Sequence, residues 1–209
     1  MEKYSYQNEA QEAEREKIKR DLAILEATEG FSLLTPRQRK IIRVSLLLQA
    51  RAERDMDPYH KNDPWYYDWH KRSGYSPKYQ GSLQHIIQWD CHGAIASLES
   101  GQPLGYEPPE NPKAFYDAEY FELTNAYQVA QAIESVGFPC VVHVNEVLGN
   151  IDGEKTQWHS FLALGHDEHK NIVTWEKTGF NLPYRVARLN QVVDDYSVTT
   201  YYWGFRKLR

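Results

Sequence analysis

The amino-acid sequence predicts an α+β fold, in which an N-terminal pair of helices precedes a domain of helices and neighbouring strands. Two observations predict the first helices: apolar residues recur at helical spacing before residue 57, and a helix start signal lies at Thr35. A third observation predicts the strands, since several short apolar runs separated by polar turns follow Pro139. Helices followed by several neighbouring strands favour an α+β layout.

The first predicted helix covers residues 8 to about 27, where the chain is charged and free of glycine. Its narrow apolar stripe consists of Ile18, Leu22 and Leu25. A second helix begins after Thr35, which is a favoured N-cap residue, while Pro36 suits the first turn and Gln38 completes a capping box. We expect residues 1–57 to form a helical hairpin that packs on the rest of the chain. The alternative is an arm that binds a partner.

The composition limits the classes of function. The chain has 209 residues and a net charge of -5, which argues against a nucleic-acid-binding protein because such proteins usually carry a basic face. Its mean hydropathy is -0.70, and we expect no membrane span. The N-terminus lacks the basic-then-apolar order of a secretory signal, and the two cysteines predict no disulfide framework. A cytoplasmic, thiol-reducing location is therefore expected.

The second half of the chain predicts a series of helices and strands. They are a helix over 125–135 that is capped by Thr124 and ended by Gly137, a buried strand over 139–144, a hairpin of strands 159–164 and 172–176, a helical turn over 189–196 and a strand over 198–206. Within the first of these strands, Cys140 is expected to be a core residue and His143 a hydrogen-bonded structural histidine.

Cys91 stands at the start of a predicted helix of small and apolar residues that ends at Gly101. An ordinary thiol, with a pKa of about 8.5, is only a few per cent thiolate at neutral pH. The partial positive charge of a helix N-terminus and a nearby imidazolium would both lower the pKa of Cys91. The alternative interpretation is that Cys91 is a buried apolar thiol without a chemical role.

Two segments resemble the motifs of NlpC-type cell-wall peptidases, a branch of the papain-like superfamily. Tyr79-Gln80-Gly81 followed by Asp90-Cys91-His92-Gly93 resembles their Tyr-x-x-Gly-Gly…Asp-Cys-Ser-Gly signature, and residues 159–165 resemble their histidine strand. The sequence departs from the pattern at His92, where the family usually has Ser, and in having one Gly near Tyr79. The resemblance covers residues 79–175. It implies a papain-like domain over 58–209, with Cys91 as the nucleophile and His159 as the general base.

A general base usually needs a third group that orients its other nitrogen. Glu176 lies on the strand expected to pair with the His159 strand, so a cross-strand contact is predicted. Papain-like enzymes usually have another residue type at this place, and the alternative is an edge-strand Glu176 paired with Lys177. By the resemblance, Tyr79 helps to stabilise the oxyanion. Gln88, Trp89 and Gln84 are further candidates for substrate or oxyanion contacts.

The segment between Asp55 and Tyr79 is rich in aromatic residues, prolines and turn formers, and predicts an irregular loop. It is either fixed to the core by its rings or forms a wall beside Cys91 that stacks on sugars or peptides. His166, Asp167, Glu168 and His169 together suggest a metal site, but a solvated hairpin turn explains them better. We therefore expect neither a metal nor a cofactor.

The sequence thus predicts a thiol hydrolase, a cysteine peptidase or amidase, that cleaves an amide bond in a peptide, a cell-wall peptide or another acyl substrate. A thiol acyltransferase would use the same residues. The alternative from another class is a catalytically inactive papain-like module that binds a peptide or glycan through its aromatic loop. No nucleic-acid or membrane partner is expected.

Overall fold

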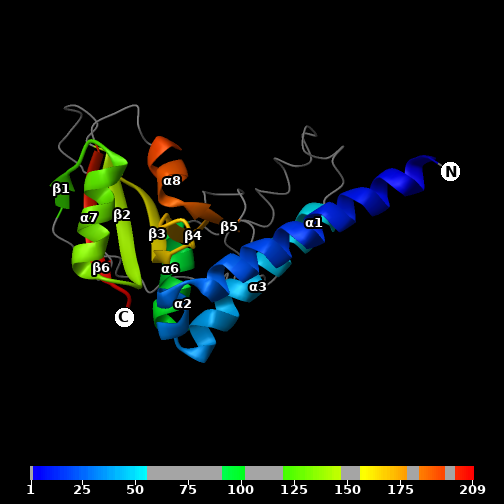
Figure 1. Cartoon of the computed structure of the whole chain (residues 1–209), viewed down its shortest axis with the longest axis horizontal. Coiled ribbons are helices and arrows are strands. Elements are labelled where there is room, and N and C mark those ends of the chain that lie inside the picture. The colour runs from blue at the N-terminus through cyan, green and yellow to red at the C-terminus, as the bar shows by residue number, and fades with distance from the viewer. Residues whose placement is uncertain (1, 56–90, 102–119, 147–155, 178–183, 196–200) are drawn as a thin grey trace.

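The computed structural model describes residues 2–55, 91–101, 120–146, 156–177, 184–195 and 201–209. This part of the chain has an α+β architecture, with helices at the N-terminus and a six-stranded antiparallel open sheet (Figure 1). The predicted fold class is confirmed at this level. The aromatic loop, Gln84 and the candidates Tyr79, Gln88 and Trp89 lie outside the described residues, so their predicted roles stay predictions.

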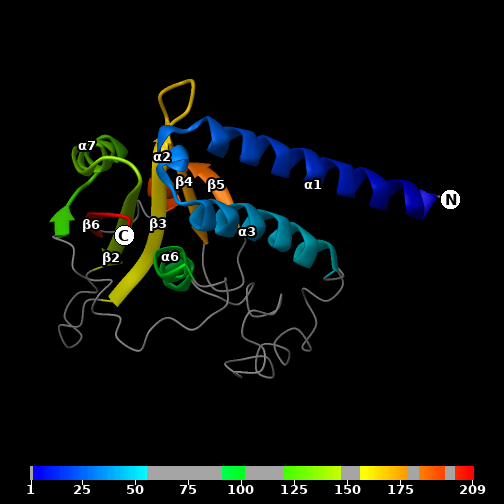
Figure 2. The ribbon, with the colours of Figure 1, turned by 90° about the horizontal axis from the view of Figure 1, so that it is seen from below.

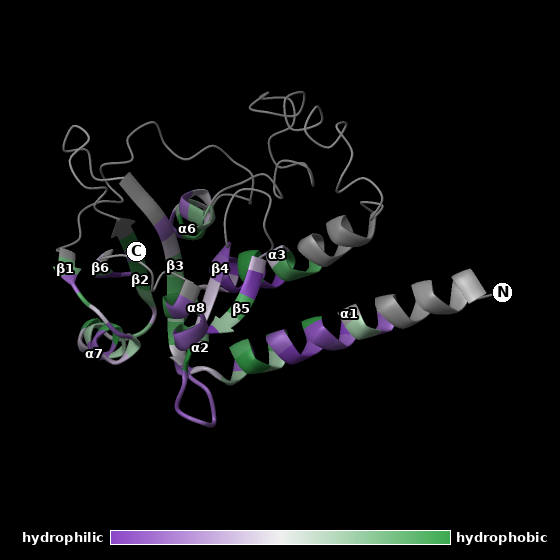
Figure 3. Cartoon of the chain, turned by 90° about the horizontal axis from the view of Figure 1, so that it is seen from above, coloured by the Kyte–Doolittle hydropathy of each residue, from purple (hydrophilic) through white to green (hydrophobic). Residues whose placement is uncertain are grey.

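The sheet has the strand order β1-β6-β2-β3-β4-β5, and every neighbouring pair is antiparallel. Its strands are β1 (Tyr120–Glu122), β2 (Cys140–Glu146), β3 (Thr156–His166), β4 (Ile172–Lys177), β5 (Tyr184–Arg188) and β6 (Tyr201–Lys207). The predicted hairpin is formed by β3 and β4, and its connecting turn is polar (Figure 3). Because β4 lies between β3 and β5, it is not an edge strand.

The helices of the described chain are α1 (Glu2–Ala27), α2 (Glu29–Leu33), α3 (Pro36–Asp55), α6 (Cys91–Ser100), α7 (Ala126–Val136) and α8 (Leu189–Asp195). Helices α1 and α3 run side by side, and α1 extends away from the sheet towards the N-terminus (Figures 1 and 2). The predicted helical pair is therefore present and packs on the remainder of the chain, with the short α2 between its two members.

The sheet separates two apolar cores. On one face, α1, α2, α3 and α6 pack over residues of β2, β3 and β4, including Val141, Leu162 and Trp175. On the other face, α7 and α8 pack over the alternate residues of these strands and over β6, including Val142, Phe161 and Phe205. This division follows from the alternation of side chains along a strand.

The predicted start of α3 is confirmed in its atomic detail. The backbone N–H of Gln38 donates to Thr35 Oγ1 at 3.2 Å, and the backbone N–H of Thr35 donates to Gln38 Oε1 at 2.9 Å. The predicted cap of α7 is wrong by one residue, since Asn125 and not Thr124 accepts the Gln128 N–H. Thr124 instead bonds the Gln128 side chain through its own N–H.

Helix α2 and strands β1 and β5 were not predicted from the sequence. Helix α2 has five residues and β1 has three, which are too few to show a period. Strand β5 covers Tyr184–Arg188, and its residues do not alternate regularly between buried and exposed positions. A pattern of that kind does not distinguish a strand from a loop.

Helix α6 begins at Cys91 and packs on β3. The sheet therefore supports the helix that has Cys91 as its first residue. The helix ends as predicted at Gly101, whose positive φ of 65° suits the residue after a helix C-terminus. Its last turn is tied to the remainder of the chain, because Arg206 of β6 pairs with Glu99 and Gln38 donates to the Leu98 carbonyl. The position of Cys91 is thus fixed by contacts at the far end of the helix.

Helix α2 approaches β3 more closely than a side chain allows. A Cβ atom on Gly30 would lie 2.0 Å from the carbonyl oxygen of Leu164, which is a backbone atom and cannot rotate away. Gly30 therefore lets the N-terminal helices dock on the strand that carries His159.

We expect Gly30→Ala to lower the free energy of unfolding by about 1–3 kcal/mol or more, because either α2 or β3 must shift. Urea denaturation followed by circular dichroism measures this change. Ser32→Ala, at an exposed position of the same helix, is the matched control and should change stability by less than about 0.5 kcal/mol. Equal stability of Gly30→Ala and the unsubstituted protein would show that this close approach is absent.

Candidate active site

Cys91 is the first residue of α6 and is 4 % exposed. Its side chain takes part in hydrogen bonds with two imidazoles, those of His159 on β3 and of His92, its neighbour on the helix. The first turn of a helix also favours an anion. The structure therefore brings the predicted nucleophile and the predicted base together, although they lie far apart in the sequence.

His159 is held from its other side by Glu176. The Nε2 atom of His159 lies 2.5 Å from Glu176 Oε2, and both side chains are 1 % exposed. Phe161 is the register partner of Glu176, so His159, two residues earlier on the same face, is its diagonal neighbour. Since Nε2 bonds the carboxylate, Nδ1 is the nitrogen of His159 that faces Cys91.

Glu176 is itself fixed by a cation from the next strand. Arg185 of β5 donates from Nε to the second carboxylate oxygen, Oε1, at 2.5 Å. Lys177, the partner in the alternative interpretation, has its ammonium 5.2 Å from the centroid of the Tyr184 ring. Glu176 therefore contacts His159, as one of the two interpretations predicted, and the edge-strand setting of the other is absent.

The pKa values of Cys91 and His159 move in opposite directions. Burial by itself raises the pKa of Cys91, but its hydrogen bonds with His159 and His92, together with the positive charge of His159, outweigh burial and bring the pKa to about 6. Burial by itself lowers the pKa of His159, but hydrogen bonds with Cys91 and Glu176 and their charges raise it to about 9. Between these two values, the favoured state is a thiolate beside an imidazolium.

Charges of opposite sign alternate along the row of side chains that runs from Arg185 to Cys91. Arg185 is a cation, Glu176 a carboxylate, His159 an imidazolium and Cys91 a thiolate, so each buried charge has a neighbour of opposite sign. Buried charges are tolerated only when they are paired and hydrogen-bonded. The arrangement can therefore keep an ionised sulfur in a site that is almost closed to water.

The second cysteine behaves differently. Cys140 on β2 is fully buried, and burial raises the pKa of its thiol to about 12. The prediction that Cys140 is a core residue is thus confirmed. The comparison also shows that burial alone does not produce the low pKa of Cys91.

A second set of polar side chains reaches Cys91 through His92, and most of it was not predicted from the sequence. Ser160 Oγ lies 2.8 Å from His92 Nδ1 and 2.7 Å from His143 Nδ1, and Arg206 donates from Nε to His143 Nε2 at 3.1 Å. His143 is fully buried, and burial together with the positive charge of the nearby Arg206 lowers its pKa to about 3. The prediction of a hydrogen-bonded structural histidine is confirmed.

The polar turn between β3 and β4 is explained by its own hydrogen bonds. Asp167 accepts from the backbone N–H groups of His169 and Asn171, and His166 pairs with Glu134 of α7 at 3.0 Å. In the described part of the chain, no three His, Cys, Asp or Glu side chains are grouped so that they could hold a metal ion.

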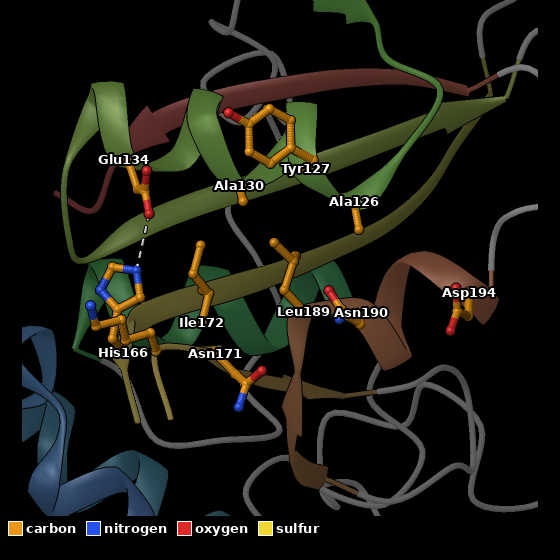
Figure 4. A pocket seen from close by; sticks show the side chains of 11 residues that line it. Ala126, Tyr127, Ala130, Glu134, His166, Asn171, Ile172, Leu189, Asn190 and Asp194 are labelled. Carbon is orange, nitrogen blue, oxygen red and sulfur yellow. Dashed lines mark hydrogen bonds and ion pairs between the residues drawn. The ribbon is translucent and has the colours of Figure 1, made fainter. Parts of the chain in front are cut away.

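A cavity of about 510 Å³ lies on the sheet face that α7 and α8 cover, and His166 and Glu134 form part of its wall (Figure 4). Neither Cys91 nor His159 lines it. The shifted pKa values of Cys91 and His159 and their contacts, and not this cavity, mark the candidate site.

No protein-family model matches this chain, and no curated protein or solved structure gives a significant match. None of the helices in the described ranges combines the length and the apolar character that a membrane span needs. The chemistry of the site therefore has to be inferred from its own geometry.

We expect Cys91 to react rapidly with iodoacetamide, a small electrophile suited to a sulfur that is 4 % exposed. Because the pKa of Cys91 is about 6, the labelling rate should already be near its plateau at neutral pH, whereas an ordinary thiol continues to gain rate up to about pH 9. Mass spectrometry of peptides from samples quenched at successive times measures the rate. Cys140, with a pKa of about 12, is the internal control and should remain unlabelled. A Cys91 rate that still rises steeply above pH 8 would contradict the ion pair.

Proposed function

We propose that the protein is a cysteine hydrolase of papain-like design, in which Cys91 attacks an amide carbonyl, His159 transfers the proton and Glu176 orients His159. The observation that supports this proposal most strongly is the continuous row of contacts from Cys91 through His159 to Glu176. This row contains the nucleophile, base and orienting group of a catalytic triad. The helix N-terminus at Cys91 supports the same interpretation.

In the first half of the reaction, the Cys91 thiolate forms a bond to the carbonyl carbon, and the π electrons of the carbonyl move onto its oxygen. When the tetrahedral intermediate collapses, the carbon–nitrogen bond breaks and the His159 imidazolium gives its Nδ1 proton to the departing nitrogen. The amine leaves, and the acyl group remains on Cys91 as a thioester. His159 is then neutral and ready to act as a base.

In the second half, His159 accepts a proton from a water molecule that attacks the thioester carbonyl. The carbon–sulfur bond breaks, the acid leaves, and the thiolate–imidazolium pair forms again. If an amine or an alcohol takes the place of water, the same steps transfer the acyl group, so a thiol acyltransferase uses the same residues.

Glu176 has two roles in this scheme. Its hydrogen bond to Nε2 holds the imidazole so that Nδ1 faces the sulfur, and its charge stabilises the imidazolium. Arg185 fixes the second oxygen and so prevents the carboxylate from rotating away from His159. Glu176 therefore orients His159, a role for which papain-like enzymes usually have another residue type.

We propose a peptide, a cell-wall peptide or another acyl compound as the substrate, following the resemblance of residues 79–175 to NlpC-type peptidases. An inactive module that binds a ligand through the aromatic loop is the alternative. A depressed thiol pKa beside an oriented imidazole has no use in such a module, so the geometry favours the enzyme.

We expect the protein to hydrolyse p-nitrophenyl acetate, a minimal activated acyl donor, through an acetylated Cys91 that intact-protein mass spectrometry detects before turnover. Cys91→Ala should reduce the release of nitrophenol to the uncatalysed background, because no other residue forms the acyl intermediate. Cys140→Ala is the matched control and should keep the activity. Undiminished turnover by Cys91→Ala would exclude the proposed nucleophile.

We expect kcat/KM to follow a bell-shaped pH profile with limbs near 6 and 9, the pKa values of Cys91 and His159. Glu176→Gln removes the charge that helps to raise the pKa of His159, so the basic limb should move to lower pH and the rate should fall by on the order of 10²-fold or more. Steady-state kinetics across the pH range measures both effects.

Glu134→Gln is the matched control, since Glu134 also pairs with a histidine, His166, but lies away from Cys91. It should change neither the limbs nor the rate. An unchanged basic limb in Glu176→Gln would show that the carboxylate does not act on the catalytic imidazole.

A further inference from the structure

A hydrogen-bonded chain leads from the last turn of α6, through three strands of the sheet, back to the first turn of the same helix. Glu99 in the last turn pairs with Arg206 of β6, and Arg206 donates to His143 of β2. His143 contacts Ser160 of β3, and Ser160 contacts His92, which follows Cys91. His143 and Ser160 stand directly opposite each other in the register of β2 and β3.

The donor and acceptor of each hydrogen bond between Arg206 and His92 follow from the chemistry of the Arg206 guanidinium. An arginine guanidinium only donates, so the Nε2 atom of His143 that receives Arg206 Nε must be an unprotonated acceptor. His143 is also fully buried, which disfavours a charge on the ring. The neutral ring therefore carries its proton on Nδ1, and this N–H donates to Ser160 Oγ at 2.7 Å.

We propose that Arg206, His143 and Ser160 are positioning residues that keep His92 as a neutral imidazole with its proton on Nε2, where it donates to the sulfur of Cys91. In this arrangement the Ser160 hydroxyl accepts from His143 and donates its own hydrogen to His92 Nδ1, 2.8 Å away. The inference rests on the proposed function, since it takes Cys91 to be the nucleophile.

The consequence is a division of roles between the two imidazoles at the sulfur. His92, with Nδ1 bonded to Ser160 and Nε2 protonated, has no vacant nitrogen and cannot accept the thiol proton. It stabilises the thiolate as a donor. His159 has Nδ1 directed at Cys91 and Nε2 at Glu176, so it alone transfers the proton. One thiol thus has one base and one separate hydrogen-bond donor.

The charged groups around the two imidazoles agree with a neutral His92. His159 and Arg206 are cations on two of the neighbouring strands, Glu176 and Arg185 form a pair on two others, and Glu99 is engaged by Arg206. The two anions that compensate His159 are Cys91 and Glu176. A further imidazolium at His92 would have to share the Cys91 thiolate with His159.

Long-range proton–nitrogen NMR spectra of the ¹⁵N-labelled protein at neutral pH identify the tautomer of each ring directly. The eight histidines can be assigned with single His→Gln variants. We expect the Nδ1–H tautomer for His143, the Nε2–H tautomer for His92 and a doubly protonated ring for His159. An Nδ1–H tautomer or an imidazolium at His92 would overturn the proposal, and so would an Nε2–H tautomer at His143.

A second experiment tests the connection through Ser160. In Ser160→Ala, the Nδ1 atom of His92 loses its donor, and the pH midpoint of iodoacetamide labelling at Cys91 should rise by about one unit. Ser160→Thr retains the hydroxyl and should restore the midpoint. Ser45→Ala is the matched control, because it removes a fully buried hydroxyl of α3 that accepts a hydrogen bond from Trp175.

Ser45→Ala should leave the midpoint unchanged, even where its thermal stability falls as much as that of Ser160→Ala. Equal midpoints in Ser160→Ala and the unsubstituted protein would contradict the proposal. Neither readout needs a substrate. The expected tautomers and midpoints in a protein that hydrolyses no acyl compound would therefore refute the hydrolase and leave the proposed role of Arg206, His143 and Ser160 standing. Hydrolysis of an acyl compound with other tautomers or midpoints would refute that role and leave the hydrolase standing.

Discussion

The buried hydrogen bond between His159 and Glu176 is the interaction on which the site depends. Both side chains are 1 % exposed, and an uncompensated charge at either position would carry a large desolvation penalty. The register of β3 and β4 brings the two residues to diagonal positions, and Arg185 on the next strand neutralises the carboxylate. The sulfur of Cys91 then completes the row as the second anion beside His159.

Helix α6 has to present this sulfur at a fixed place, and both of its ends are held. The Glu99–Arg206 pair secures the last turn on β6, while the contact of His92 with Ser160 secures the first turn on β3. The same side chains that anchor the helix also form the hydrogen-bonded chain through His143. Structural support and control of the ionisation state are therefore performed by one set of residues, and a substitution in this set affects both.

Much of this arrangement could be predicted from the sequence, because it depends on local signals. The capping box of Thr35 and Gln38, the end of α6 at Gly101 and the β3–β4 hairpin each follow from residues close together in the chain. Cys91 was identified from its place at a predicted helix start, His159 through a resemblance, and Glu176 through the expected pairing of its strand with the His159 strand. What the sequence could not supply was the order of strands in the sheet.

The strand order explains why the hydrogen-bonded chain from Arg206 through His143 and Ser160 to His92 was not predicted. β6 pairs with β2, although more than fifty residues separate them, and only this pairing brings Arg206 to His143. Ser160 carries no signal of its own, since a serine in an apolar strand predicts neither a partner nor a role. His92 could be identified as a departure from a family pattern, but its contact with Ser160 depends on how α6 lies over β3.

The central claim, a thiolate–imidazolium pair inside the protein, is tested most directly by locating hydrogen atoms at the site. A neutron structure of the deuterated protein at a pH of about 7.5, between the pKa values of Cys91 and His159, makes these atoms visible. We predict deuterium on both Nδ1 and Nε2 of His159 and none on Cys91 Sγ. Deuterium on the sulfur beside a bare Nδ1 would contradict the account.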